Sequence, residues 1–187
     1  MIRWTPEKVR ELAERLEAFR QRRRVTTLAE EERTRSPFRL LVACVISLRT
    51  KDEVTAEASR RLFDIAPTPD GLAELEEKRI AQAIYPAGFY NTKARQLREI
   101  ARILRDTFGG EVPSEEGALL ALPGVGRKTA NLVLGLGFGI PAICVDTHVH
   151  RISNRLGLVT SKTPEQTEKA LAEVLPRDLW VPINDLM

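Results

Sequence analysis

Lys128 is well placed to do chemistry, because it lies just beyond a turn whose two glycines, Gly124 and Gly126, flank a single apolar residue. Glycine takes positive φ readily and has no Cβ, so such a turn can bring main-chain N–H groups close to a phosphate. Helical patterns surround the turn and predict a helix-hairpin-helix over about residues 115–137. The positive end of the second helix would face outward, as in anion sites. The motif indicates a DNA backbone as the partner.

Lys128 itself has two interpretations, a surface lysine or a nucleophile. A cation near a helix N-terminus is disfavoured by the helix dipole, so an acidic residue would serve a purely structural role better. A neutral lysine amine is a competent nucleophile. The pattern alone leaves the two interpretations evenly balanced.

Asp146 follows Lys128 by eighteen residues and comes directly after an apolar run, residues 140–145. An amphipathic helical pattern begins next, so Asp146 is predicted to cap that helix by accepting the N–H of His148 or Val149. We expect a chemical role as well, because the cap would hold the carboxylate rigidly while one of its oxygens faces a neighbouring cleft.

The composition is that of an ordinary globular protein, with 187 residues, 43% of them hydrophobic, and a formal net charge of +3. This length suits one large domain or two small lobes. Basic clusters can neutralise phosphates, although each cluster alone is more often a solvated face. The clusters are Arg20 with residues 22–24, Arg60 with Arg61, Lys93 with Arg95 and Arg98, and Arg127 with Lys128.

The cysteines and histidines predict neither a disulfide framework nor a metal site. Cys44 and Cys144 lie in apolar runs, which is typical of buried thiols in a reducing compartment. His148 and His150 are two residues apart, so they lie on different faces of a helix, and no other ligands accompany them.

The ends and apolar runs predict a cytoplasmic protein. The longest apolar run, residues 40–48, is too short to span a bilayer. A helix cap and proline at residues 5–7 argue against a secretory leader. In a prokaryote we therefore expect the protein to be cytoplasmic and associated with the nucleoid.

Nearly every segment has helical periodicity, and strand signals are almost absent. Apolar residues recur at helical spacing over residues 9–19 and 97–108. Capping signals occur at Thr68 and Thr163, each followed by proline. Residues 38–48 are apolar on all sides, which predicts a central buried helix. The expected fold class is all-α.

Residues 122–131 and 145–151 together closely resemble the endonuclease III family of DNA glycosylases, whose fold is named for a helix-hairpin-helix, a Gly/Pro-rich segment and an aspartate. Residues 36–41 are similar to the start of the family's central helical barrel, and residues 88–94 to its DNA-facing loop. The resemblance therefore covers most of the chain.

The resemblance implies a two-lobed, all-α glycosylase fold. One lobe, residues 37–139, would be a helical barrel that contains the hairpin. The second lobe would combine residues 1–36 with residues 140–187.

The resemblance also implies an activity. Lys128 would be the Schiff-base nucleophile and Asp146 its activating carboxylate. Because the family's adenine-excising branch lacks this lysine, the chain resembles the bifunctional branch, which removes a damaged base and then cuts the strand as an AP lyase. The implied partner is double-stranded DNA with oxidised pyrimidines or abasic sites, bound by a monomer. The implied DNA contacts are Leu122, Gly124, Val125, Gly126, Arg127, Thr129, Arg49, Phe89, Lys93 and His148.

Two of these positions differ from the family pattern. Arg49 stands where bacterial relatives commonly have a glutamine that fills the gap left by the flipped base, and Phe89 stands where a leucine wedge is usual. Arginine can still fill the gap and phenylalanine can still stack. The roles are expected to persist with an altered preference for the opposite base.

Family members typically carry four cysteines that hold a 4Fe–4S cluster. This chain has two cysteines, and its apolar last stretch, residues 180–187, is similar to the segment before the cluster loop. Such a cluster needs four thiolates, so no cofactor and no metal are expected in this chain unless a cysteine loop follows Met187. An exposed apolar end would leave the second lobe incomplete and poorly stable.

Two alternatives stay open. A mismatch-specific thymine glycosylase would share the fold, and the hairpin cannot separate the two because phosphate contacts carry no base information. A non-catalytic helix-hairpin-helix module would need the glycines but neither Lys128 nor Asp146.

Overall fold

The structure is a computed structural model that describes residues 4–20 and 36–187, without the side chain of Arg20. The predicted basic cluster combines Arg20 with residues 22–24, and residues 22–24 lie outside the described residues. The chain divides into two compact units. We call Val25–Phe138 the hairpin unit, and Met1–Arg24 with Gly139–Met187 the discontinuous unit. The described residues form helices joined by loops, so the predicted all-α class is confirmed.

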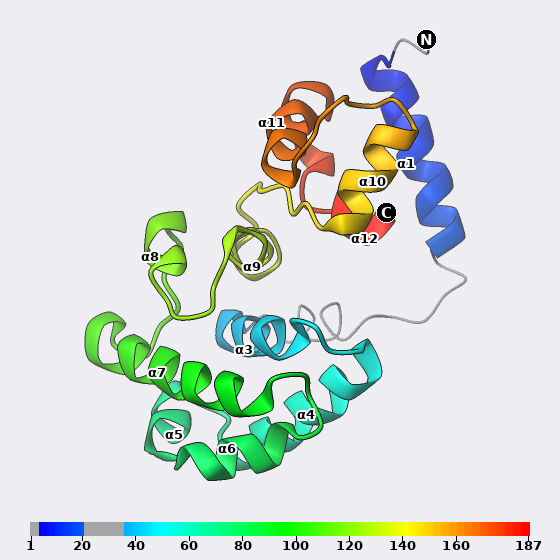
Figure 1. Ribbon diagram of the computed structural model, residues 1–187. Helices are drawn as coiled ribbons and strands as arrows, with labels where there is room; N and C mark the ends of the chain where they lie inside the picture. The colour runs from blue at the N-terminus through cyan, green and yellow to red at the C-terminus, as the bar shows by residue number, and fades with distance from the viewer. Residues whose placement is uncertain (1–3, 21–35) are drawn as a thin grey trace. The chain divides into compact units, whose positions relative to one another are not determined.

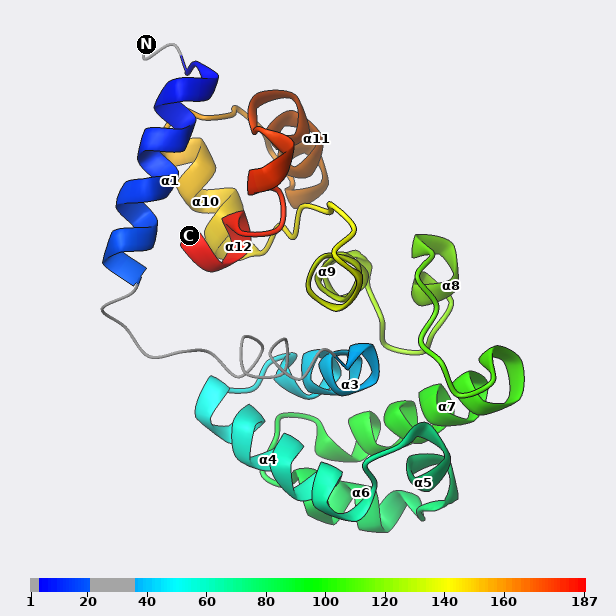
Figure 2. The same cartoon turned by 180° about the vertical axis from the view of Figure 1, so that it is seen from behind.

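The hairpin unit is built around the buried helix α3 and the long helix α7. Helices α5 and α6 pack along α7, while α3 packs against α4, α7, α9 and the π-helical segment η1 (Figures 1 and 2). The elements in chain order are α3 (Pro37–Ser47), α4 (Asp52–Ile65), α5 (Pro69–Glu74), α6 (Glu77–Ile84), α7 (Tyr90–Phe108), α8 (Glu116–Leu120), α9 (Arg127–Leu132) and η1 (Val133–Gly137).

Helix α3 is the predicted central buried helix. The hydroxyl of Ser36 accepts the N–H of Arg39 at 3.3 Å, and Pro37 occupies the first turn, where a missing N–H costs nothing. Residues 40–46 are at most 1% exposed. A helix that is apolar on every side is stable only when surrounded, which is why α3 forms the centre of this unit.

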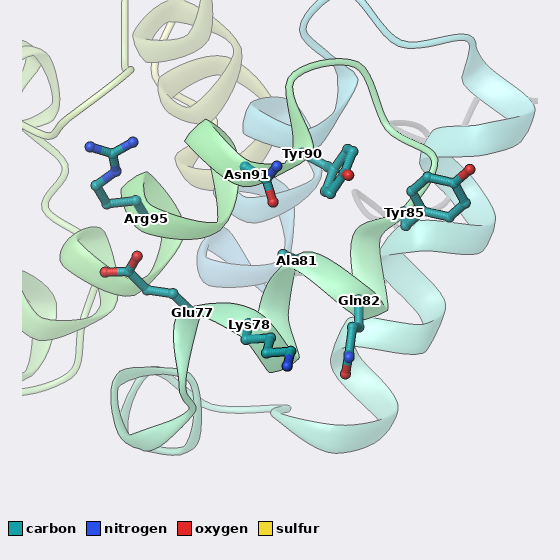
Figure 3. A pocket seen from close by; sticks show the side chains of 8 residues that line it. All are labelled: Glu77, Lys78, Ala81, Gln82, Tyr85, Tyr90, Asn91 and Arg95. Carbon is teal, nitrogen blue, oxygen red and sulfur yellow. The ribbon is translucent and has the colours of Figure 1, made fainter.

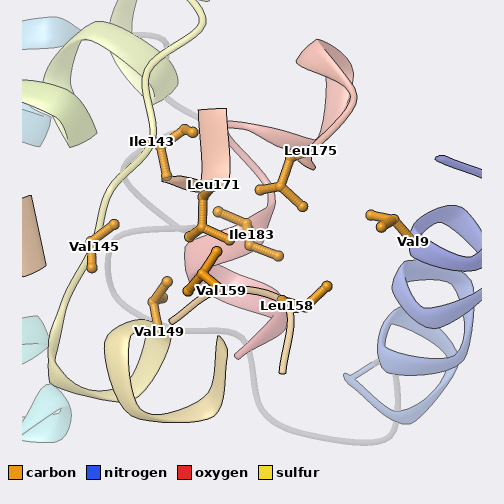
Figure 4. Packing of buried hydrophobic residues seen from close by; sticks show 9 residues of the cluster. All are labelled: Val9, Ile143, Val145, Val149, Leu158, Val159, Leu171, Leu175 and Ile183. Atoms are coloured by element: carbon orange, nitrogen blue, oxygen red, sulfur yellow. The ribbon is translucent and has the colours of Figure 1, made fainter. Parts of the chain in front are cut away.

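The discontinuous unit joins helices from both ends of the sequence. They are α1 (Pro6–Arg20), α10 (Thr147–Arg155), α11 (Pro164–Val174), the 3₁₀ turn η2 (Arg177–Leu179) and α12 (Ile183–Leu186). Figure 4 shows how side chains from these helices and their loops meet in one apolar cluster. The cluster consists of Val9, Ile143, Val145, Val149, Leu158, Val159, Leu171, Leu175 and Ile183.

The apolar last stretch is part of this core and does not form an exposed apolar end. Ile183 is 3% exposed, and Trp180 and Met187 pack against the cluster. The indole N–H of Trp180 donates to the carbonyl of Leu175 at 3.2 Å. Burial of these side chains removes apolar area from water, which stabilises the unit.

The predicted caps form as expected. The hydroxyl of Thr68 accepts the N–H of Gly71, and that of Thr163 accepts the N–H of Gln166. Within the described residues, no helix is long and apolar enough to cross a membrane.

Candidate active site and DNA-facing loops

The predicted hairpin joins α8 to α9. The N–H of Val125 donates to the carbonyl of Leu122 at 3.1 Å, which closes a tight turn. Gly124 has φ +78°, and a Cβ placed there would lie 2.7–2.8 Å from the amide group of Gln96. The positive φ therefore favours glycine here, whereas the Gln96 amide is the end of a flexible side chain that can move aside.

The hairpin presents backbone and charged groups while its apolar side chains point inward. Leu122, Val125 and Thr129 are 3%, 6% and 3% exposed, so these three predicted DNA contacts lie almost entirely below the surface. Gly124, Gly126, Arg127 and Lys128 are exposed. The Arg127 guanidinium lies 3.7 Å from the Glu116 carboxylate, which links the two helices of the motif.

Lys128 lies in the first turn of α9. The N-cap of this helix is Gly126, which makes no side-chain capping bond. After Leu132 the chain continues as the π-helix η1, instead of the single apolar α-helix expected over this stretch. Residues 129–135 are buried, and α9 and η1 pack on α3. This packing fixes the helix that carries Lys128.

Asp146 caps α10, as predicted. Its Oδ1 accepts the N–H of His148 at 2.9 Å and the N–H of Val149 at 2.8 Å. Ile143, Cys144 and Val145 are buried and anchor the chain just before the cap. Two hydrogen bonds to one oxygen fix the orientation of the carboxylate, which suits a positioned acid–base group.

The two histidines have separate surroundings, as their spacing predicts. The Nδ1 of His148 lies 3.2 Å from the Arg151 guanidinium. The Nδ1 of His150 lies 2.6 Å from the hydroxyl of Thr167, which is fully buried. Among the described residues, no group of three or more potential ligands could hold a metal ion.

The residues of this chain do not fit a 4Fe–4S cluster. The cluster needs four thiolates, and the sequence holds only Cys44 and Cys144. Their side chains are buried at 1% and 2% exposure, one in each unit, and form no disulfide.

Arg49 and Phe89, which we call the wedge pair, are the two non-glycine residues with positive φ in the described part of the chain, at 53° and 57°. Left-handed backbone costs an L-residue roughly 1–2 kcal/mol, so the surrounding loops must hold this conformation. The Arg49 guanidinium carbon lies 5.6 Å from the centre of the Phe89 ring. Phe89 is 63% exposed, so the loops present an apolar ring and a cation side by side.

Lys93, which the family resemblance implied as a DNA contact, is buried in the structure. It is 4% exposed, and its ammonium donates to the carbonyls of Ile46 and Leu48 and to the hydroxyl of Thr50, at 2.7, 2.5 and 2.9 Å. These bonds use all three donors of a lysine ammonium. Burial lowers the pKa of Lys93 from 10.5 to about 8.

A signal for this burial is present in the sequence. Lys93 lies four residues before Leu97, on the same helical stripe as the buried Ile100, Ala101 and Leu104. Thr50, the shared hydrogen-bond partner, gave no comparable signal.

A cavity of about 680 Å³ lies in the hairpin unit between α6 and α7 (Figure 3). Tyr85 and Tyr90 meet edge to face there, with ring centres 5.3 Å apart. None of the predicted site residues lines it. Its lining is Glu77, Lys78, Ala81, Gln82, Tyr85, Tyr90, Asn91 and Arg95.

Comparison with known proteins agrees with this geometry. Residues 42–177 match the model of the HhH-GPD superfamily of base excision DNA repair proteins. Endonuclease III of Thermotoga maritima is 54% identical over 151 residues, which are 81% of this chain and 71% of that relative. The chain belongs to the endonuclease III family. The predicted family, fold and enzyme class, a DNA glycosylase with AP lyase activity, are thereby confirmed.

Solved structures of similar DNA-repair enzymes share the fold. A trapped endonuclease III–DNA covalent intermediate has a TM-score of 0.83 and 32% identity, over 100% of this chain and 84% of that one. A thermostable thymine-DNA glycosylase has a TM-score of 0.79 and 26% identity, over 96% and 85%.

Proposed function

We propose that this endonuclease III family member is a bifunctional DNA glycosylase and AP lyase that acts on oxidised pyrimidines, with Lys128 as nucleophile and Asp146 as its carboxylate partner. The observation that carries the proposal is the lysine in the first turn after a glycine hairpin. The likeness to a trapped covalent endonuclease III–DNA complex supports it, because such an intermediate requires a nucleophile.

The hairpin supplies a grip on the DNA backbone. The turn exposes its glycines, and α9 begins without a side-chain cap. Main-chain N–H groups at a helix start, together with the helix dipole, favour a phosphate. This contact sets the position of the protein on DNA and carries no sequence information.

The wedge pair serves base flipping. Extrusion of a nucleotide costs a few kcal/mol, and the cost is smallest for damaged bases. Arg49 can fill the gap left by the base and hydrogen-bond the orphaned base opposite, while the exposed ring of Phe89 can stack as the wedge. This division of roles accounts for an aromatic and a cation on adjoining loops.

The chemistry begins when the neutral amine of Lys128 attacks C1′ of the flipped nucleoside. The C1′–N bond breaks and the base leaves with the bonding electrons and a proton. Asp146 takes the proton from the attacking amine or stabilises positive charge on the sugar. The C1′–O4′ bond of the sugar then breaks as the nitrogen lone pair forms a protonated imine at C1′, and O4′ takes up the proton held by Asp146 or one from water. The imine acidifies the 2′ proton, so β-elimination expels the 3′ phosphate and nicks the strand.

Borohydride trapping tests the nucleophile. A lysine imine is reducible, so borohydride added to the protein on an abasic-site duplex is expected to give a covalent protein–DNA adduct. Lys128→Gln removes the amine and is expected to abolish the adduct. An adduct of undiminished yield with this variant would assign the nucleophile elsewhere.

A mismatch-specific thymine glycosylase is the second candidate, since a solved thymine-DNA glycosylase shares the fold. Duplexes that each carry a single thymine glycol or a single G·T mismatch separate the two. The first proposal expects faster cleavage at thymine glycol.

We further propose that the enzyme acts as a monomer at the nucleoid of a prokaryotic cytoplasm, and that this chain works without an iron–sulfur cluster.

A further inference from the structure

Lys93 joins the two loops that carry the wedge pair. Arg49 follows α3, and Phe89 is the N-cap of α7. Lys93 lies in the first turn of α7, where its N–H donates to the carbonyl of Phe89 at 3.0 Å. Its side chain reaches the end of α3, where the ammonium donates to the carbonyls of Ile46 and Leu48, just before Arg49 in the chain.

The ammonium is stabilised at this buried place by the end of α3. The last carbonyls of a helix lack partners within the helix and form the negative end of its dipole. Helix α3 has no basic residue in its own last turn. Lys93 supplies that cation from another helix, so the end of α3 and the start of α7 are bound together.

Thr50 completes the link between the loops. Its hydroxyl accepts hydrogen bonds from the Lys93 ammonium at 2.9 Å and from the N–H of Gly88 at 3.1 Å. The backbone of Gly88 lies against the carbonyl of Arg49, where a Cβ would come within 2.4 Å. Thr50, next to Arg49, and Gly88, next to Phe89, are thus joined through the Thr50 hydroxyl, which also binds Lys93.

We propose that Lys93 is a positioning residue that holds Arg49 and Phe89 as one preformed wedge for insertion into duplex DNA. The inference rests on the proposed function, because a wedge matters only to an enzyme that flips bases. Without Lys93 the two loops lose their common anchor, and the left-handed conformations of Arg49 and Phe89 relax. Insertion then requires the loops to reorder on the DNA.

The test uses Lys93→Met, which keeps the apolar stem and removes the ammonium. Cleavage at thymine glycol in duplex DNA is expected to fall about ten- to a hundredfold, the scale of misplaced groups. Cleavage of a single-stranded abasic oligonucleotide is expected to stay at the wild-type rate, because no stacked gap must be filled. Ile100→Val, a core change in the same helix, controls for a general loss of stability and is expected to affect neither substrate.

The decisive comparison repeats Lys93→Met in a Phe89→Ala background. If Lys93 acts through the wedge, its effect largely disappears there, since interacting sites are not additive. An undiminished effect in that background, or full duplex activity of Lys93→Met, would overturn the proposal. Thr50→Val, a near-isosteric change at the same centre, is judged by the same criteria if Lys93→Met does not fold.

Two readouts separate this inference from the proposed function. A 2-aminopurine base beside the lesion reports unstacking without any bond cleavage, and its fluorescence gain is expected to be smaller with Lys93→Met than with the wild type. A wild-type protein that unstacks DNA but gives no borohydride adduct would refute the proposed chemistry alone. If Lys93 instead bound a phosphate, Lys93→Met would flatten the slope of log affinity against log salt by about one unit relative to the wild type, and that result would also overturn the proposal.

Discussion

Replacement of Gly88 by alanine tests the close contact between the two wedge loops. The added Cβ would lie 2.4 Å from the carbonyl oxygen of Arg49, and real Cβ contacts under 3.0 Å essentially never occur. The loops must therefore separate by about 0.6 Å. A backbone oxygen cannot rotate away as a flexible side chain can.

The expected cost combines two effects. Overpacking typically costs about 1–3 kcal/mol, and loss of the hydrogen bond from Gly88 to Thr50 adds about 1 kcal/mol. We expect the free energy of unfolding to fall by about 2–4 kcal/mol. A loss of this size lowers the Tm of a chain of this length by about 4–16 °C.

Urea unfolding and calorimetry measure this loss, and Gly117→Ala is the matched control. Nothing lies within 4 Å of a Cβ at Gly117, which sits in α8. Alanine is the better helix former, so the control is expected to gain about 0.5–1 kcal/mol. A Gly88→Ala protein as stable as the wild type would show that the two loops are not held together as described.

Three further outcomes are expected. Asp146→Asn keeps the helix cap and slows base removal by about a hundredfold or more, whereas Asp146→Ala also loses about 1 kcal/mol of stability; an unfolded Asn variant would favour a purely structural role for this residue. The pKa of Lys93 is about 8 in the folded protein against the usual 10.5, so between these pH values the unfolded chain binds the proton more tightly. The free energy of unfolding of the wild type, relative to that of Lys93→Met, should therefore rise with pH across this window. A difference that falls with pH, measured by urea unfolding, would contradict this. The purified 187-residue chain should lack stoichiometric iron and broad absorption near about 400 nm, and a brown preparation would contradict this.

The sequence by itself determined the local features of the site. Gly124, with φ +78°, marks a turn that few other residues can form, whereas Gly126 has ordinary extended backbone. Asp146 caps α10 through bonds to N–H groups two and three residues ahead. Such interactions join neighbours in the chain, so residue type and spacing are enough to predict them. The buried helix α3 followed from composition in the same way, because an apolar helix must be surrounded.

Only the tertiary structure decided the role of Lys93 and the packing of the last stretch. Lys93 stands in a basic cluster, and a lysine on an apolar stripe can equally extend its ammonium to solvent. Its partners, Ile46 and Leu48, lie more than forty residues earlier, at the end of another helix. Trp180 and Ile183 likewise pack in a core formed with residues of α1, α10 and α11. Contacts between distant segments depend on how helices pack, and no local pattern encodes that arrangement.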